Sequence, residues 1–116
     1  MGLTDFTYLE SITGRDKEIT EELVSVFIEQ VPECISELNQ AFEDKDYEAL
    51  SSYAHKYKST VVIIGLSETE SRLKNLELSL KDGKKLDDET IKSEIDKIEE
   101  DLLVALDEVN DYLESL

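Results

Sequence analysis

Apolar residues recur every three or four positions along most of the chain, which is the spacing of amphipathic helices rather than of strands. A short first helix is expected at Tyr8–Ile12, closed by Gly14, and a longer helix from about Asp16. The same spacing continues beyond Pro32, so this proline marks either a kink or the start of a new helix.

The second half of the chain carries the signals of further helices. Asp46 is a candidate N-cap for a helix that runs to about Ile64, where Gly65 suits a C-terminal end. Ser67 and Glu70 form the S-x-x-E pattern of a capping box, which predicts that the next helix starts there.

The last helix is expected from about Asp87, after a turn formed by the KDGKK segment at residues 81–85. Its apolar residues make one long stripe at steps of three and four: Ile91, Ile95, Ile98, Leu102, Leu106, Val109 and Leu113. Amphipathic helices joined by short loops must bury such stripes against one another. The predicted fold class is therefore all-α, an up-down antiparallel four-helix bundle with a short extra N-terminal helix, and residues 1–116 are expected to form a single domain.

Composition argues against several classes of partner. The 116 residues include 29 acidic and only 12 basic side chains, a net charge of −17, whereas nucleic acid and anionic lipid require a basic surface. No run of 18 apolar residues indicates membrane insertion, and the first residues lack the features of a secretion signal. Cys34 is the only cysteine, so no internal disulfide forms, and we expect it to be buried. These features predict a cytoplasmic protein.

Positive charge is concentrated in the middle of the chain. Residues 51–85 contain seven basic and four acidic side chains, a net charge of +3, whereas residues 1–50 (3 against 13) and 86–116 (2 against 12) each carry −10. The basic segment contains His55, the only histidine, within AHKYKST. The basic segment is either an ordinary solvent-exposed surface with few acidic residues or a site that binds a negatively charged group.

The neighbours of His55 favour a site. Residues three and four apart share a helix face, and around His55 these are Ser51, Ser52, Lys58 and Ser59. The apolar residues of this helix lie on its other side. His55 is therefore expected at the surface in the middle of the helix, and not in the core.

An exposed neutral imidazole is a nucleophile near neutral pH and can accept a phosphoryl group on nitrogen. Lys58, one turn further on, is placed to offset the charge of that group, whereas Lys56 can help only from the side. One His and one Cys provide no zinc-ligand spacing, so no metal site is expected. Phosphate-binding glycine loops are missing too, so ATP binding is not expected.

These residues resemble the signature of histidine phosphotransfer (HPt) domains. In that signature an Ala-His pair is followed by Lys three residues after the His, then small residues, and Gly ten residues after it; the matches are Ala54, His55, Lys58, Thr60 and Gly65. The similarity extends over nearly the whole chain, from the lead-in at residues 8–50 to a leucine-rich stretch that ends at Glu77.

Two positions depart from the family pattern: Tyr57 and Ser59 stand where the family often has Leu and Gly. The Tyr57 ring can pack into the core, but its hydroxyl then needs a partner or access to water. Ser59 is small enough to leave the approach to His55 open.

The resemblance implies a phosphorelay intermediate of two-component signalling. His55 is then the phospho-acceptor, which takes a phosphoryl group from the phospho-aspartate of a response-regulator receiver domain and passes it to another, and Lys58 stabilises the charge. The receiver supplies Mg²⁺, so the protein needs no cofactor of its own, and a hybrid sensor histidine kinase is a further expected partner. The resemblance implies a monomeric phosphocarrier, not an enzyme, without kinase or ATP-binding motifs.

The receiver is expected to dock over the face around His55, with contacts from Lys56, Ser52, Ser59 and Val62. Ordinary core packing explains Val62 equally well, and it explains Ile12, which the resemblance places at the rim of the docking face. The acidic remainder of the chain either restricts which surfaces dock or aids solubility.

Two other functions are compatible with a helical chain. A non-catalytic helical adaptor would bind partner proteins whether or not His55 is present. Kinase dimerisation domains usually have an acidic residue directly after the histidine and a proline one turn later, whereas Lys56 follows here and no proline occurs after Pro32. Phosphotransfer is therefore the preferred interpretation.

Overall fold

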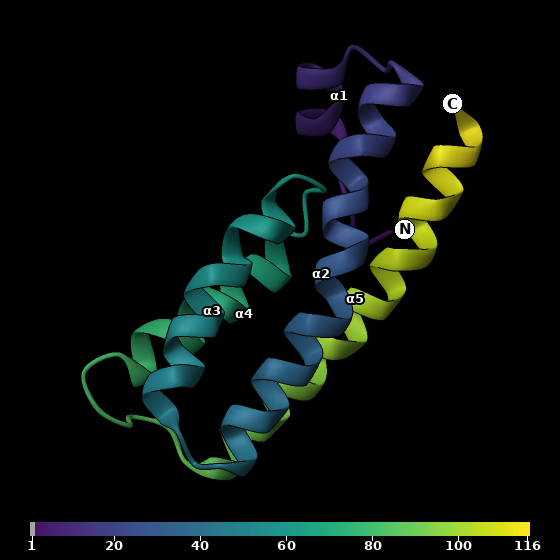
Figure 1. Ribbon diagram of the computed structural model, residues 1–116. Helices are drawn as coiled ribbons and strands as arrows, with labels where there is room; N and C mark the ends of the chain where they lie inside the picture. The colour runs from purple at the N-terminus through teal and green to yellow at the C-terminus, as the bar shows by residue number, and fades with distance from the viewer. Residues whose placement is uncertain (1) are drawn as a thin grey trace.

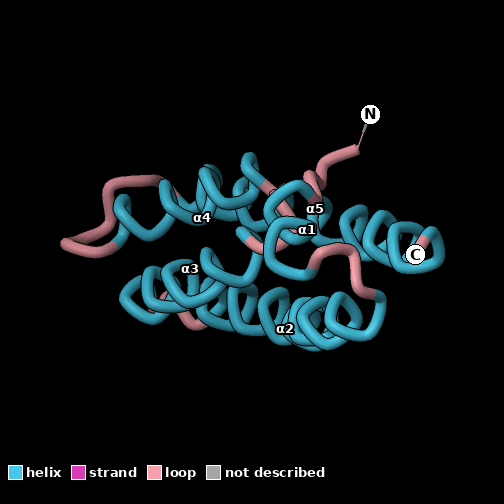
Figure 2. Tube along the Cα trace, turned by 90° about the horizontal axis from the view of Figure 1, so that it is seen from above, coloured by secondary structure: helices cyan, strands magenta, loops and turns pink. Residues whose placement is uncertain are grey.

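The computed structural model describes residues 2–116 and forms five helices and no strand over that range. The helices are α1 (Thr7–Thr13), α2 (Lys17–Glu43), α3 (Tyr47–Val62), α4 (Ser67–Leu80) and α5 (Asp88–Ser115). Helices α2 to α5 form a ring in which each contacts the next and α5 returns to α2, while α1 packs against α2 at one end (Figure 1). The view from above shows α3 beside α4 and against α2, with loops only at the helix ends (Figure 2). The predicted bundle with its short N-terminal helix is confirmed.

Aspartate side chains cap three of the long helices at the starts that the sequence predicted, and the cap at Asp46 was itself predicted. The side chains of Asp16, Asp46 and Asp87 accept hydrogen bonds from the backbone N–H three residues later, at 2.9, 3.0 and 2.9 Å. Each cap satisfies a donor that has no partner inside the helix. The KDGKK segment forms the turn between α4 and α5, as expected.

One of the two alternatives for Pro32 is wrong, and so is the predicted capping box at the start of α4. Helix α2 does not start afresh at Pro32 but runs through it, because its buried positions Phe27, Val31 and Cys34 keep their spacing across the proline. Pro32 is exposed, so its ring and its missing N–H interrupt the backbone only on the solvent side. The capping box at Ser67 does not form either: Leu66 is the N-cap, and no side chain caps α4.

The core is made of the inward faces of all five helices. Its largest fully buried side chains are Tyr57, Phe27, Leu9, Leu38, Leu50, Ile64, Leu66, Leu73, Leu76, Ile91, Ile95 and Ile98. Cys34 is buried as expected, and burial raises the pKa of its thiol to about 12. Within residues 2–116, no helix has the length and apolar character needed to cross a membrane.

The N-terminal segment, residues 2–6, fastens one end of the bundle. The backbone N–H groups of Leu3 and Thr4 donate to the Glu108 carboxylate on α5 at 3.0 and 2.9 Å, and the ring of Phe6 stacks on Tyr112. The Asp5 N–H donates to the Ile64 carbonyl at 3.0 Å. These bonds hold the segment against the turn that ends α3.

Gly65 in that turn is required by its conformation and by its neighbour. Its φ is +68°, a region that favours glycine, and a Cβ built at this position would lie 2.1 Å from the Asp5 carbonyl oxygen. Helix α3 ends at Val62, two residues before the predicted Ile64, which turns into the core instead. The turn thereby fixes where the histidine helix stops and where α4 begins.

Candidate functional site

His55 lies in the middle of α3 on the face opposite the core. Leu50, Ala54, Tyr57 and Val61 on the same helix are buried, whereas the His55 side chain is 69 % exposed. The predicted exposure of the imidazole is therefore confirmed. Helix α3 fixes the backbone of His55, and the exposed imidazole is accessible to an incoming molecule.

A carboxylate from the neighbouring helix joins His55 to Lys58. His55 Nδ1 lies 2.7 Å from Glu77 Oε2, and Lys58 Nζ lies 2.9 Å from Glu77 Oε1. The Glu77 side chain is only 11 % exposed. The Lys58 hydrogen bond lowers the pKa of Glu77, burial opposes that shift, and the His55 hydrogen bond lowers the pKa further. Glu77 is consequently an ionised acceptor at neutral pH.

The position of Glu77 is itself secured by packing. It follows Leu73 and Leu76 on the buried face of α4, and its backbone carbonyl accepts a 2.9 Å hydrogen bond from the Ser51 hydroxyl. Ser51 is therefore largely buried between α3 and α4, with its hydroxyl bonded to α4, rather than open to solvent beside His55. The sequence contains one signal for Glu77, because it is a charged residue at a position where α4 is otherwise apolar. That signal does not reveal its partners, His55 and Lys58.

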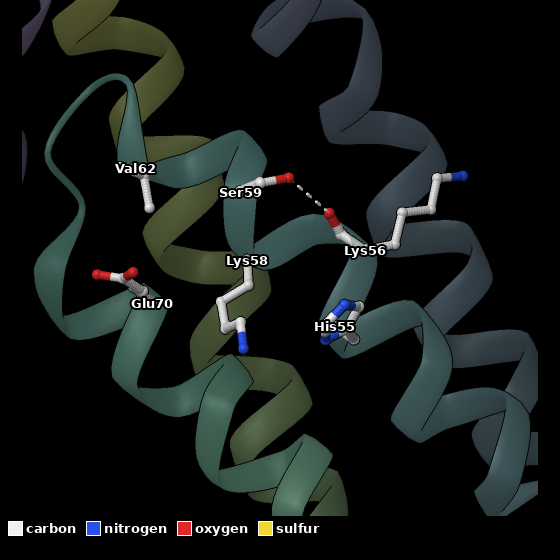
Figure 3. Close-up of a pocket in the computed structure, with 6 residues that line it drawn as sticks. All are labelled: His55, Lys56, Lys58, Ser59, Val62 and Glu70. Atoms are coloured by element: carbon white, nitrogen blue, oxygen red, sulfur yellow. Dashed lines mark hydrogen bonds between the residues drawn. The ribbon is translucent and has the colours of Figure 1, made fainter.

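Lys56 takes a different direction from Lys58. Its Nζ lies 3.5 Å from Glu37 Oε1 on α2 and 4.9 Å from the centre of the Tyr57 ring. Figure 3 shows Lys56 extending toward α2 while Lys58 and His55 project together on the other side. The Tyr57 ring is buried, and its hydroxyl donates to Glu37, which is the partner that its burial required. Burial raises the pKa of the Tyr57 hydroxyl, and the hydrogen bond to Glu37 raises it further.

Two hollows flank the imidazole. The first hollow, drawn in Figure 3, is lined by His55, Lys56, Lys58, Ser59, Val62 and Glu70. The second hollow is lined by Ser51, Ser52, His55, Glu77 and Lys81. The predicted docking residues are thus divided, with Ser59 and Val62 on one side of His55 and Ser52 on the other.

The apolar candidates are accessible. Val62 is 39 % exposed and lines the first hollow, so the alternative that it is ordinary core is wrong. Ile12 on α1 is 48 % exposed, but it lines neither hollow. Glu70 lines the first hollow and Lys81 the second, and neither was predicted as a site residue.

The donor set around His55 has few metal ligands. Across residues 2–116, no group of three or more His, Cys, Asp or Glu side chains is arranged to hold a metal ion. Glu77 is already bonded to His55 and Lys58. The arrangement is that of a nucleophilic imidazole oriented by a carboxylate, with a cation beside it.

Comparison with known proteins agrees with a site of this kind. The family model described as Hpt domain matches residues 22–116. The chain is similar to the phosphorelay intermediate protein YPD1 of Candida albicans, with 28 % identity over 79 residues, which is 66 % of this chain and 43 % of that protein. The chain thus spans less than half the length of this curated relative. No solved structure matches it. The matched range contains α3, His55 and the hollows around it, and the chain belongs to the Hpt domain family.

Proposed function

We propose that the protein is a phosphorelay intermediate of two-component signalling, in which His55 accepts a phosphoryl group from a receiver-domain phospho-aspartate and passes it to another receiver. One observation carries this proposal: an exposed imidazole whose Nδ1 is held by a buried carboxylate. Membership of the Hpt family and similarity to a phosphorelay intermediate support it.

The contact with Glu77 selects the reactive nitrogen. Because Glu77 is an ionised acceptor, Nδ1 of the neutral ring carries the proton and donates it. The lone pair of the ring is then on Nε2, the nitrogen away from Glu77. Nε2 attacks the phosphorus, the N–P bond forms, the P–O bond to the aspartate breaks, and the aspartate leaves as a carboxylate.

Charge balance in the product follows from the same contacts. Phosphorylation of Nε2 leaves a positive ring that keeps its Nδ1 proton, and the Glu77 carboxylate compensates it. Lys58 is bonded to the Glu77 carboxylate and lines the first hollow together with His55, so we propose that it stabilises the phosphoryl oxygens there. Transfer through a loose transition state depends mainly on such positioning and charge neutralisation.

The partners follow from this chemistry. They are response-regulator receiver domains, which supply Mg²⁺ with the phospho-aspartate, and upstream a hybrid sensor histidine kinase. The bundle buries its own apolar stripes, so we propose that it acts as a monomer. We further propose a cytoplasmic phosphocarrier without kinase activity, as the family resemblance implies. Docking covers both hollows, with Lys56, Ser52, Ser59 and Val62 at the contact.

The test is intact mass, measured under non-acidic conditions, after mixing the protein with a phosphorylated receiver and Mg²⁺. One acid-labile phosphate per chain is expected, and none with ATP alone. A folded protein that takes no phosphate from several receivers would favour the helical adaptor, which the family membership does not favour. Phosphorylation by ATP alone would indicate a kinase.

Glu77→Gln is expected to slow phosphorylation about tenfold, because a neutral amide binds Nδ1–H less strongly and no longer compensates the charged ring. The measurement is the rate of phosphate incorporation by mass spectrometry. Glu68→Gln is the matched control, since Glu68 is exposed on the same helix and lines neither hollow. An unchanged rate in Glu77→Gln would remove the carboxylate from the mechanism.

The same variant is expected to show a pH-dependent loss of stability. The pKa of Glu77 is lowered in the folded state, so its stabilising effect is present above the ordinary value of 4.5 and is lost as pH falls through the folded value. Urea unfolding at pH 7 should show wild type about 1–2 kcal/mol more stable than Glu77→Gln. At about pH 3 the difference should shrink. A difference that does not change with pH would contradict the ion pair.

A further inference from the structure

One carboxylate lies among the basic residues that line the first hollow. Glu70 is a partly buried residue in the first turn of α4, and it lines this hollow together with His55 and Lys58. In the view of Figure 3 its carboxylate lies on the Val62 side of the hollow and the imidazole at the other end. A protein docked over the first hollow would therefore cover Glu70 as well as the histidine.

The Glu70 carboxylate has no cation of its own in the part of the chain that the structure describes. Within that part, no nitrogen of a Lys, Arg or His side chain lies within 4.0 Å of it. Lys58, which lines the same hollow, donates to Glu77 at 2.9 Å, and Lys56 lies 3.5 Å from Glu37. The negative charge of Glu70 is thus stabilised by solvent, which a docked protein would displace.

The start of α4 does not use Glu70 either. If the capping box had formed, the Glu70 side chain would accept the backbone N–H of Ser67. That N–H donates instead to the Gly65 carbonyl at 2.9 Å, and no side chain caps the helix. Glu70 is thereby left in the hollow and is not bonded to the backbone of its own helix.

We propose that Glu70 selects receivers whose docking surface places a lysine or arginine in the first hollow. This inference rests on the proposed phosphotransfer function, in which docking covers both hollows. Docking removes water from Glu70, and a carboxylate that is buried without a partner is strongly unfavourable. A basic side chain of the receiver offsets that cost with a charge-assisted hydrogen bond, whereas an acidic side chain adds repulsion. The hollow, with a volume of about 550 Å³, has room for such a side chain.

A purely structural role for Glu70 predicts a different result. Glu68 and Glu70 both lie in the first turn of α4, where an acidic side chain stabilises the helix by interaction with its dipole. That effect changes the stability of the fold and does not depend on the phosphodonor. Glu68→Lys is therefore the matched control, because it makes the same change of charge in the same turn, at an exposed residue that lines neither hollow.

The test compares a phosphorylated receiver domain with phosphoramidate, a small phosphodonor that reacts with histidine without docking. The initial rate of phosphate incorporation is measured against donor concentration. With the receiver, Glu70→Lys is expected to raise KM about tenfold and to leave kcat within about twofold, because docking and not the chemical step is impaired. Glu70→Gln should raise KM about threefold and weaken its dependence on salt. With phosphoramidate, whose P–N bond breaks as Nε2 attacks and ammonia leaves, every variant should react within about threefold of wild type.

A reciprocal experiment identifies the partner group on the receiver. Each exposed lysine and arginine of the receiver is exchanged in turn for glutamate. One of these receiver variants is expected to transfer poorly to the wild type and to recover transfer with Glu70→Lys, since the exchange restores a pair of opposite charges.

Equal KM values for wild type and Glu70→Lys, or equal increases in Glu70→Lys and Glu68→Lys, would overturn the inference and leave the relay proposal standing. A scan in which no receiver variant recovers transfer with Glu70→Lys would overturn it too. A wild type that accepts phosphate from phosphoramidate but from no receiver would overturn the relay proposal, and the inference with it.

Discussion

His55→Gln is expected to abolish acid-labile phosphorylation, with a loss of at least about a thousandfold, while the fold stays intact. The amide of glutamine has no nucleophilic lone pair on nitrogen, and the chain has no second histidine to replace the first. The side chain at this position is 69 % exposed, so the change in unfolding free energy should be within about 0.5 kcal/mol. Intact mass after incubation with a phosphorylated receiver gives the phosphate content.

Lys74→Gln serves as the control for the loss of a polar side chain at the surface. Lys74 is exposed on α4 and lines neither hollow, so the phosphate content of this variant should be near that of wild type. Circular dichroism and thermal unfolding establish that both variants are folded. Retained phosphate in a folded His55→Gln protein would mean that another residue is the acceptor.

Gly65→Ala is expected to destabilise the bundle by about 2–4 kcal/mol. The new Cβ would need the space of the Asp5 carbonyl oxygen, 2.1 Å away, and alanine is strained at a φ of +68°. The N-terminal segment must then move away from the Ile64 carbonyl. Urea unfolding gives the free energy, and hydrogen exchange of residues 2–6 reports whether the segment is released.

Gly14→Ala separates the two causes. Gly14 has a similar φ of +59°, but a Cβ there would meet nothing within 4 Å. Its substitution should cost only the conformational strain, about 1 kcal/mol. Equal destabilisation by the two variants would mean that the close approach of Asp5 to Gly65 contributes nothing.

The sequence was sufficient for the helices because apolar spacing and aspartate caps are local signals. Asp46 caps its helix as expected, and Asp87 caps α5 at the start that the apolar spacing predicted. Tertiary packing decides where a local signal is ambiguous. Pro32 left a kink and a fresh start both open, and the chain continues as one helix because the buried residues on both sides pack on the same core. The capping box expected at Ser67 does not form.

The site was predictable to the same extent. Helix geometry alone predicts that His55 is exposed and that Lys58, three residues later, lies on the same face. The structure shows both: His55 is exposed, and the two residues line one hollow. The link through Glu77 depends on the register of α4 against α3, which no local pattern specifies. For the same reason the pairing of Lys56 with Glu37 and the second hollow with Lys81 appear only in the folded chain.

The bonds of the N-terminal segment bear on the order of events during translation. Leu3 and Thr4 find their acceptor on Glu108, residues that are 105 and 104 positions apart in the chain. When the segment leaves the ribosome, neither Glu108 nor the Tyr112 ring that stacks on Phe6 has been synthesised. Contacts of such long range slow folding and leave apolar surface uncovered in the meantime. The histidine helix is thus complete well before the end of the bundle that it depends on can close.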